Sequence, residues 1–114
     1  MPDQRDIVLI PVPFTDLSSS KRRPVLVLSR SAFNRRSQDI IVAAITSNPH
    51  ARESIPLTQA DMESGTLPVE SFIRADKVYT LSKSIIVKEI GRVKPACFER
   101  VLAGLDAVLG RTRK

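Results

Sequence analysis

The sequence has few of the residues on which most catalytic and metal sites depend. Its 114 residues include one cysteine, Cys97, and one histidine, His50. A single cysteine excludes an intramolecular disulfide and a cysteine-rich zinc site, and a single histidine excludes a multi-histidine metal site within one chain. Walker-type and GxGxxG glycine loops are also missing. We therefore expect no metal and no cofactor, and we interpret His50 as a surface loop residue and Cys97 as a packed helix residue.

Aromatic residues and long apolar runs are also scarce. Aromatics make up 4% of the chain and tryptophan is absent, which favours aliphatic strands over aromatic stacking platforms. No segment approaches the roughly 20 apolar residues that span a bilayer. Residues 1–6 are mostly polar, so we expect no signal peptide, no membrane partner and a cytoplasmic location.

Basic residues are abundant and unevenly distributed. There are 18 Lys and Arg against 12 Asp and Glu, a net charge of +6, and residues 21–38 carry six basic residues and no acidic one. Such an excess indicates a polyanionic partner, although basic loops can also simply keep a small domain in solution.

The hydrophobic pattern predicts short strands followed by one helix. A chain of this length forms one domain, which we assign to residues 1–114. Apolar or alternating runs predict strands, and the connections 30–38 and 58–66 are expected to be loops. The strand candidates are residues 7–10, 25–29, 39–45, 54–57, 68–79 and 85–90.

The period changes to helical after Pro95. An apolar stripe at helical spacing is formed by Phe98, Val101, Leu102, Leu105, Val108 and Leu109. Proline suits the first turn of a helix, and Gly110 suits its end. The prediction is a mainly β fold, a small barrel of five to seven strands with a C-terminal amphipathic helix packed on it.

Two strand ends carry groups that bind phosphate. Arg23 begins one apolar strand candidate, and Thr46 and Ser47 end the next. In an antiparallel pair the start of one strand lies beside the end of the other, so Arg23 and Thr46 are expected to meet at one sheet edge. Arginine can donate two hydrogen bonds to a phosphate whose charge grows during reaction. On spacing alone, a solvated charge and a strand-end cap explain these residues equally well.

The order of several motifs resembles the MazF/PemK family of toxins from type II toxin-antitoxin systems. The similarity runs from about Asp6 to Leu109. It rests on the segments Asp6-Ile7-Val8-Leu9-Ile10-Pro11, Phe14-Thr15-Asp16, Lys21-Arg22-Arg23-Pro24-Val25-Leu26-Val27-Leu28-Ser29, Val42-Ala43-Ala44-Ile45-Thr46-Ser47 and Ser71-Phe72-Ile73-Arg74-Ala75-Asp76.

This resemblance implies an SH3-like, CcdB-like barrel that forms a homodimer and cleaves single-stranded RNA without a metal. The 2′-hydroxyl of the RNA is then the nucleophile, and the products carry a 2′,3′-cyclic phosphate and a 5′-hydroxyl. The catalytic arginine and threonine of the family correspond to Arg23 and Thr46, and an Arg-x-Asp element of the PemK-like branch corresponds to Arg74 and Asp76. An acidic antitoxin is the implied partner.

The remaining basic and hydroxyl residues near these positions are expected to bind RNA. They are Lys21, Arg22, Ser47, Arg35 and Arg36. Asp76 is a candidate base for the 2′-hydroxyl with Arg74 as its partner, although a structural salt bridge explains that pair too. Phe72 and Tyr79 are the only stacking candidates in this neighbourhood, and a core role is at least as good an explanation for each.

The sequence also departs from the family pattern. Members often have Arg-Gly-Asp or Lys-Gly-Asp before the first strand, where this chain has Gln4-Arg5-Asp6, and its loop 15–21 lacks glycine and histidine. Two other function classes stay open. One is a non-catalytic CcdB-like protein that poisons DNA gyrase through its C-terminal region, residues 110–114, and the other is a barrel that binds nucleic acid without cutting it.

Overall fold

The computed structural model describes residues 2–11 and 21–111. These residues form seven strands and two α-helices, with two short 3-10 turns between strands. They are β1 (Asp6–Pro11), β2 (Arg22–Val27), α1 (Ser31–Arg36), β3 (Asp39–Thr46), β4 (Ser54–Leu57), η1 (Gln59–Asp61), β5 (Met62–Gly65), β6 (Ser71–Ser82), η2 (Lys83–Ile85), β7 (Lys88–Val93) and α2 (Pro95–Val108). Most of the polar loop expected between the first two strands, residues 12–20, lies outside the described residues.

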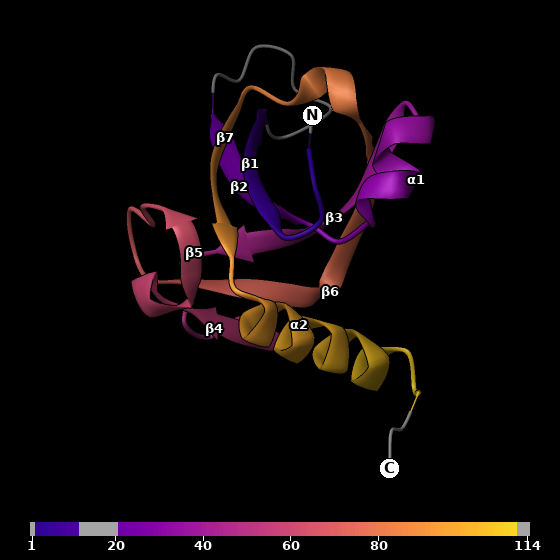
Figure 1. Ribbon diagram of the computed structural model, residues 1–114. Helices are drawn as coiled ribbons and strands as arrows, with labels where there is room; N and C mark the ends of the chain where they lie inside the picture. The colour runs from indigo at the N-terminus through magenta and orange to yellow at the C-terminus, as the bar shows by residue number, and fades with distance from the viewer. Residues whose placement is uncertain (1, 12–20, 112–114) are drawn as a thin grey trace.

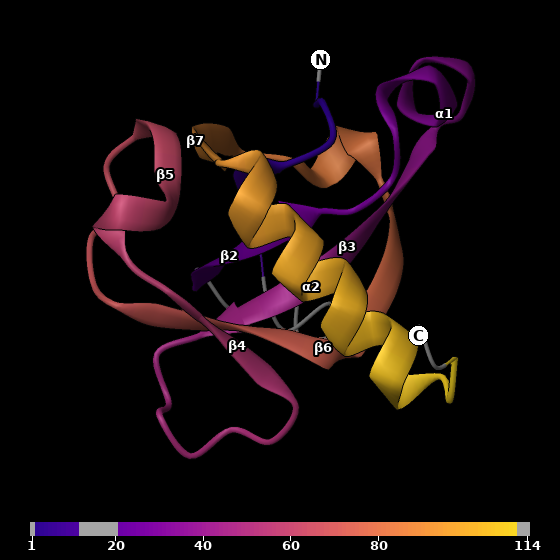
Figure 2. The same ribbon diagram turned by 60° about the horizontal axis from the view of Figure 1, so that its bottom comes forward.

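All seven strands belong to one antiparallel sheet that curls into a half-barrel (Figure 1). The strand order across the sheet is β4-β6-β3-β2-β1-β7-β5. The long strand β6 pairs with both β3 and β4. Helix α2 lies across one side of β6 and β3 (Figure 2). The predicted mainly β fold with a C-terminal helix is therefore confirmed.

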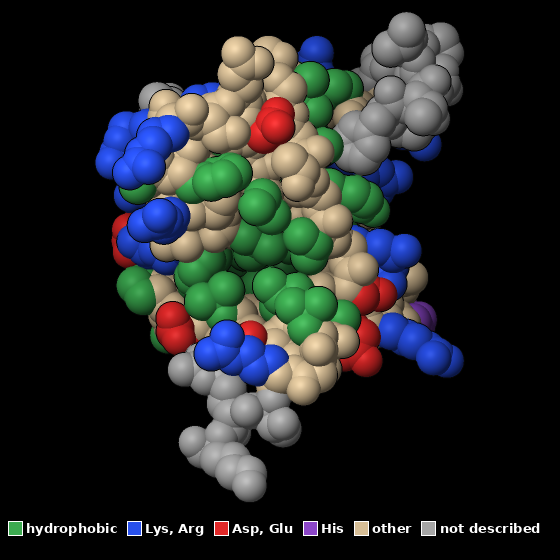
Figure 3. Space-filling view, turned by 90° about the vertical axis from the view of Figure 1, so that its right-hand side faces the viewer, with side chains coloured by type: hydrophobic (Ala, Val, Ile, Leu, Met, Phe, Trp, Pro, Cys, Tyr) green, Lys and Arg blue, Asp and Glu red, His purple; other side chains and the backbone are tan. Residues whose placement is uncertain are grey.

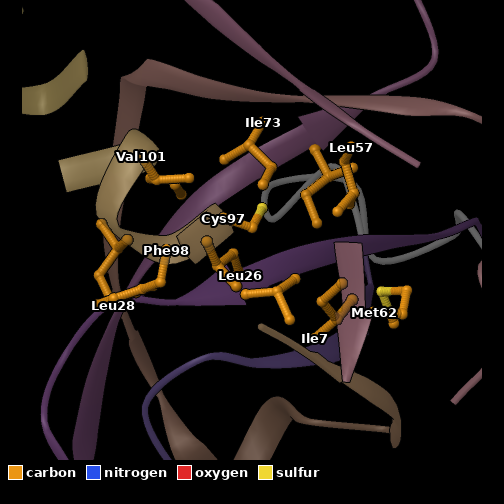
Figure 4. Close-up of a cluster of buried hydrophobic side chains, with 12 residues drawn as sticks. Ile7, Leu26, Leu28, Leu57, Met62, Ile73, Cys97, Phe98 and Val101 are labelled. Atoms are coloured by element: carbon orange, nitrogen blue, oxygen red, sulfur yellow. The ribbon is translucent and has the colours of Figure 1, made fainter. Parts of the chain in front are cut away.

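The sheet has two faces with different coverings. On one face, here called the α2 face, Cys97, Phe98 and Val101 of α2 pack against apolar side chains of the sheet (Figure 4). The sheet residues of this cluster include Ile7, Leu26, Leu28, Ala43, Ile45, Leu57 and Ile73. The first half of the predicted apolar stripe of α2 packs here, whereas Val108 and Leu109 at its end stay exposed, so the periodicity after Pro95 predicted the helix and the side that it turns to the sheet but not how far that contact extends.

The opposite face, here called the site face, has a second and smaller apolar cluster. Its buried members are Val8, Ile10, Val25, Val27, Ile40 and Val42, with Leu81, Ile85 and Ile86 packed against them. Strands β2 and β3 are thus buried on both faces, which explains why their sequences are nearly continuous aliphatic runs.

Three segments differ from the sequence prediction. The expected loop 30–38 contains α1, held by Asn34, whose side chain is fully buried. The Asn34 amide donates to the carbonyl oxygens of Ser29 and Pro2. These bonds, of which the one to Pro2 joins residues far apart in sequence, stabilise a six-residue helix that has little periodicity of its own.

The other two differences concern β5 and β7, which lie side by side at one end of the sheet. The expected loop 58–66 contains η1 and β5, a four-residue polar strand that pairs with β7. The strand predicted at 85–90 begins instead at Lys88, because Ile85 and Ile86 cover the site-face cluster. In both places packing against neighbours overrides local preference.

Arg5 adopts a backbone conformation that usually belongs to glycine, with φ of 80°. It stands at the position where the resembling family often has glycine. The Arg5 amide donates to the Val27 carbonyl oxygen, and its guanidinium donates to Val93 O and to Glu63 Oε1. These contacts hold a left-handed residue that costs about 1 kcal/mol or more for a side chain with a Cβ.

In residues 2–11 and 21–111, no helix is both long enough and apolar enough to cross a bilayer.

Candidate active site

Strand pairing brings Arg23 and Thr46 together. Val25 pairs with Ala44, Leu26 with Ala43 and Val27 with Val42. The same antiparallel register, continued for two residues, sets Arg23 opposite Thr46. Side chains directly opposite each other lie on one face with Cβ atoms about 5 Å apart. Both residues therefore lie at one end of the site face, as the strand-end argument predicted.

A bulge in β6 adds Arg74 and Asp76 to the same region. Thr46 pairs with Phe72 and Ala44 pairs with Arg74, but Ala43 pairs with Val78, so the register shifts between these two alanines. Arg74 is thus a diagonal neighbour of Thr46 on the site face. Asp76 lies in the segment between Arg74 and Val78, which has no pairing partner in β3. Bulges of this kind re-aim side chains next to functional sites.

Arg74 and Asp76 form a two-pronged ion pair. Nε and Nη2 of Arg74 donate to Oδ1 and Oδ2 of Asp76 at 3.1 and 2.8 Å. Each side chain keeps 26% of its surface exposed. The hydrogen bonds from Arg74, followed by its positive charge, lower the pKa of Asp76. The carboxylate is therefore ionised at neutral pH and stays accessible to a ligand.

The hydroxyl of Thr46 is held by a local turn. Thr46 Oγ1 accepts a hydrogen bond from the Asn48 backbone amide at 3.1 Å. Since one lone pair of the oxygen is engaged, the hydroxyl proton remains available to donate to a bound oxygen. The turn continues through Asn48 Oδ1, which accepts from the His50 amide.

The other predicted RNA-binding residues are distributed over three places. Arg22 pairs with Pro11 and alternates with Arg23, so its side chain leaves from the α2 face. Ser47 is exposed in the turn that directly follows β3. Lys21 is exposed directly before β2.

Arg35 and Arg36 lie at the far end of the sheet. They close α1, which leads into the first residue of β3, whereas Thr46 is the last residue of that strand. Eight extended residues span roughly 25 Å. Figure 2 shows β3 running from α1 to its tip beside β4 and β6. Arg35 and Arg36 are therefore separated from Arg23 by most of the length of the sheet.

The arrangement at the strand ends offers a particular set of chemical groups. Two guanidinium groups, one hydroxyl donor and one ionised carboxylate lie on neighbouring strands, a set that can neutralise a phosphate and accept a proton. Cys97 is buried, and burial raises the pKa of its thiol, so it is a poor nucleophile. Among the described residues, no three His, Cys, Asp or Glu side chains gather as a metal site would require.

The Asn48 amide was missing from the residues singled out in the sequence. A threonine followed two residues later by asparagine and then proline is the local signal for a hydroxyl that accepts a backbone hydrogen bond. Ser54 of β4 was missed as well. It pairs with Arg74 on the side away from β3.

Comparisons with known proteins identify the family of this chain. The family model described as "PemK-like, MazF-like toxin of type II toxin-antitoxin system" matches residues 3–109. The chain is 30% identical over 88 residues to endoribonuclease MazF4 of Mycobacterium tuberculosis, covering 77% of this chain and 79% of that protein. It is 31% identical over 91 residues to endoribonuclease MazF6 of the same organism, covering 79% and 80%.

Solved structures share the fold over nearly the whole chain. A mycobacterial endoribonuclease in complex with its cognate antitoxin superposes with a TM-score of 0.81 at 20% identity, covering 100% of both chains. A MazE-MazF structure from Deinococcus radiodurans gives 0.78 at 24% identity, covering 97% of this chain and 98% of that one. From the sequence match and this shared fold, the chain belongs to the PemK-like, MazF-like toxins of type II toxin-antitoxin systems.

Proposed function

We propose that this protein is an endoribonuclease toxin that cleaves single-stranded RNA without a metal ion. The observation that carries the proposal is the register that sets Arg23 opposite Thr46, with Arg74 and Asp76 on the adjacent strand. Relatives of 30% identity are endoribonucleases. Because those relatives are MazF endoribonucleases, the gyrase-poisoning alternative is not favoured.

The 2′-hydroxyl of the RNA is the nucleophile in this proposal. Its oxygen attacks the adjacent phosphorus, and its proton passes to the carboxylate of Asp76. The bond from phosphorus to the 5′-oxygen of the next nucleotide breaks, and that oxygen leaves as a hydroxyl after taking a proton from solvent, to which Asp76 then returns its own. The products are a 2′,3′-cyclic phosphate and a 5′-hydroxyl, so no water is consumed in this step.

Arg23 stabilises the phosphate as its negative charge grows, and Arg74 acts on Asp76 instead. Arg23 is exposed and makes no ion pair with any described residue, so its guanidinium is available to two non-bridging oxygens. Arginine stays protonated in proteins, which suits charge stabilisation rather than proton transfer. Thr46 donates its hydroxyl proton to a phosphate oxygen, and Arg74 orients Asp76.

The test is incubation of a long single-stranded RNA with the protein in excess EDTA. We expect discrete fragments whose 5′-hydroxyl ends accept a label from polynucleotide kinase without prior phosphatase treatment. An oligonucleotide with a 2′-deoxyribose at a mapped cleavage position should stay intact, because it lacks the nucleophile. Intact RNA with the wild-type protein, or cleavage of the deoxy-substituted oligonucleotide at that position, would contradict the proposal.

An acidic antitoxin is the second partner that we propose. The related structures include toxins in complex with their antitoxins. This chain carries a net charge of +6, so an acidic peptide laid over the strand ends would be attracted to Arg23 and Arg22. Binding should weaken as salt rises, whereas an apolar interface would show little dependence on salt. A cytoplasmic location follows from the proposed RNA substrate.

The proposed homodimer has a matching apolar surface. Figure 3 shows hydrophobic side chains gathered on the side of the molecule where α1, β6 and the end of α2 lie. The exposed large apolar side chains of these elements include Val78 of β6, which is 38% exposed, and Leu109 at the end of α2, which is 72% exposed. The half-buried side chains of Ile41, Leu102 and Leu105 lie between α2 and the sheet. Exposed apolar surface of this kind marks an interaction site.

The oligomeric state of one substitution tests the dimer. Leu109→Asp places a charge on an exposed position at the end of α2, and we expect a monomer by light scattering. Val69→Asp is the matched control, because Val69 is 58% exposed but precedes β6 in a turn. A dimer that survives Leu109→Asp would mean that the two copies associate through another surface.

A further inference from the structure

Phe72 occupies an unusual place on the site face. It pairs with Thr46 of β3 on one side and with Pro56 of β4 on the other. Its neighbours in sequence, Ser71 and Ile73, are buried on the α2 face, whereas Phe72 is half-buried. The strand alternation therefore turns this ring towards the side of the sheet that carries Arg23 and Thr46.

Phe72 does not belong to the packed interior. Within residues 2–11 and 21–111, neither of the two apolar clusters includes it, as a buried member or as a half-buried side chain packed against one. Phe98, by contrast, is 5% exposed and lies in the cluster beneath α2. Aromatic rings bury large apolar areas and usually dominate a core. Core packing therefore does not explain why a phenylalanine lies beside a cluster of charged groups.

A row of three side chains across the strand ends matches the phosphate and the base of a nucleotide. Arg23, Thr46 and Phe72 lie on three adjacent strands, so the row passes from a cation through a hydroxyl to an aromatic ring. Strands are spaced about 4.8 Å apart, which sets Phe72 about 10 Å from Arg23 at the backbone. A phosphate held by Arg23 and Thr46 would thus leave the attached nucleobase within reach of the ring.

We propose that Phe72 forms a base-stacking subsite for a nucleotide that flanks the cleaved phosphate. The ring stacks on the face of one nucleobase, and the exposed ring of Pro56 forms the wall beside it. This subsite rests on the proposed function in that its ligand is single-stranded RNA. Stacking tolerates all four bases, but it strengthens with the size of the ring system, so purines are preferred at this position.

A fluorescent reporter can test the stacking directly. The chain contains no tryptophan, so Phe72→Trp introduces a single indole at the subsite. The probe is a single-stranded RNA oligonucleotide that carries 2′-deoxyribose at the cleaved position, and its binding is followed separately by the anisotropy of an end label. Phe33→Trp is the matched control, because Phe33 is 38% exposed in α1, at the far end of β3.

We expect the oligonucleotide to quench the emission of Phe72→Trp by at least twofold at saturation and to leave that of Phe33→Trp unchanged. Emission of Phe72→Trp that stays constant while anisotropy reports saturation would overturn the subsite. Equal quenching of both tryptophans would also overturn it, since the effect would then not be local to Phe72.

A second measurement covers the case in which tryptophan perturbs the site. Phe72→Leu keeps an apolar side chain but removes the stacking surface, and we expect oligonucleotide affinity to fall about tenfold. Replacing the stacked flanking base by an abasic ribose should weaken wild-type binding by a similar factor. The same replacement should leave the affinity of Phe72→Leu for the oligonucleotide unchanged. If an abasic ribose weakens binding to Phe72→Leu as much as it weakens wild-type binding at every flanking position, Phe72 has a purely structural role. That result would overturn the subsite.

These readouts separate the subsite from the proposed function. Quenching and the abasic effect together with uncut RNA would keep the base-stacking subsite and refute the endoribonuclease. Cleavage by the wild-type protein without either effect would keep the endoribonuclease and refute the subsite.

Discussion

Replacing Arg23 and Arg22 one at a time gives the sharpest test of the candidate active site. The two residues are adjacent, both are exposed and each carries one positive charge. Their side chains leave opposite faces of β2, because Arg23 pairs with Ile10 and Arg22 with Pro11. Arg23→Ala and Arg22→Ala therefore change the net charge equally, but only the first removes the guanidinium opposite Thr46.

The structure sets the size of each effect. A preorganised donor aimed at a developing negative oxygen contributes about 100-fold to 1,000-fold to kcat, so Arg23→Ala should lose that factor. Arg22→Ala should raise KM and keep kcat, and it should reduce the salt slope of RNA binding by about 0.7 for one lost phosphate contact. Exposed positions change stability by about 0.5 kcal/mol at most, so both variants should unfold like the wild type.

The assay is single-turnover cleavage of a fluorescent oligonucleotide in EDTA at several salt concentrations. Arg23→Lys is the third variant, since lysine keeps the charge but loses the two-pronged geometry, and it should fall between wild type and Arg23→Ala. Equal loss of kcat in Arg22→Ala and Arg23→Ala would refute the reasoning, because charge alone would then explain both. Unchanged kcat in Arg23→Ala would remove Arg23 from the chemical step.

Substitutions at three further positions test other predictions from the structure. Thr46→Val keeps the shape but loses the hydroxyl that the Asn48 amide holds, so cleavage should slow about 100-fold while Thr46→Ser stays active, as measured by the same kinetics. Asp76 has its pKa lowered below the ordinary 3.8 by Arg74, so it is charged above that pH and neutral only in stronger acid. If Asp76 is the base, the acidic limb of the pH–rate profile should lie below pH 4 and disappear in Asp76→Asn; a limb near pH 6 would exclude it. Arg5 has φ of 80°, so Arg5→Gly should be more stable than Arg5→Ala by about 1 kcal/mol in urea unfolding, the reverse of the usual order, and equal stability would mean that the turn relaxes.

The sequence alone predicted the strands that form the centre of the sheet and the helix that covers it. Strands β2 and β3 read as aliphatic runs because both of their faces are buried, and the α2 stripe repeats at helical spacing because one side packs on the sheet. Helix α1 and strand β5 left no such signal. Asn34 holds α1 partly through a bond to Pro2, which is remote in sequence, and β5 pairs with β7 although its four residues include no aliphatic run.

For the site, the sequence determined which residue types stand at the strand ends, and antiparallel pairing then made the meeting of Arg23 and Thr46 a prediction from order alone. The tertiary structure decided the rest. The register shift in β6 pairs Arg74 with Ala44 and leaves Asp76 in a bulge, and it turns Phe72 towards the same face. A one-residue change of register would reverse every one of these side chains, since successive residues of a strand point to opposite faces. Local sequence does not specify where a bulge falls, because its position depends on how the packed faces of neighbouring strands fit together.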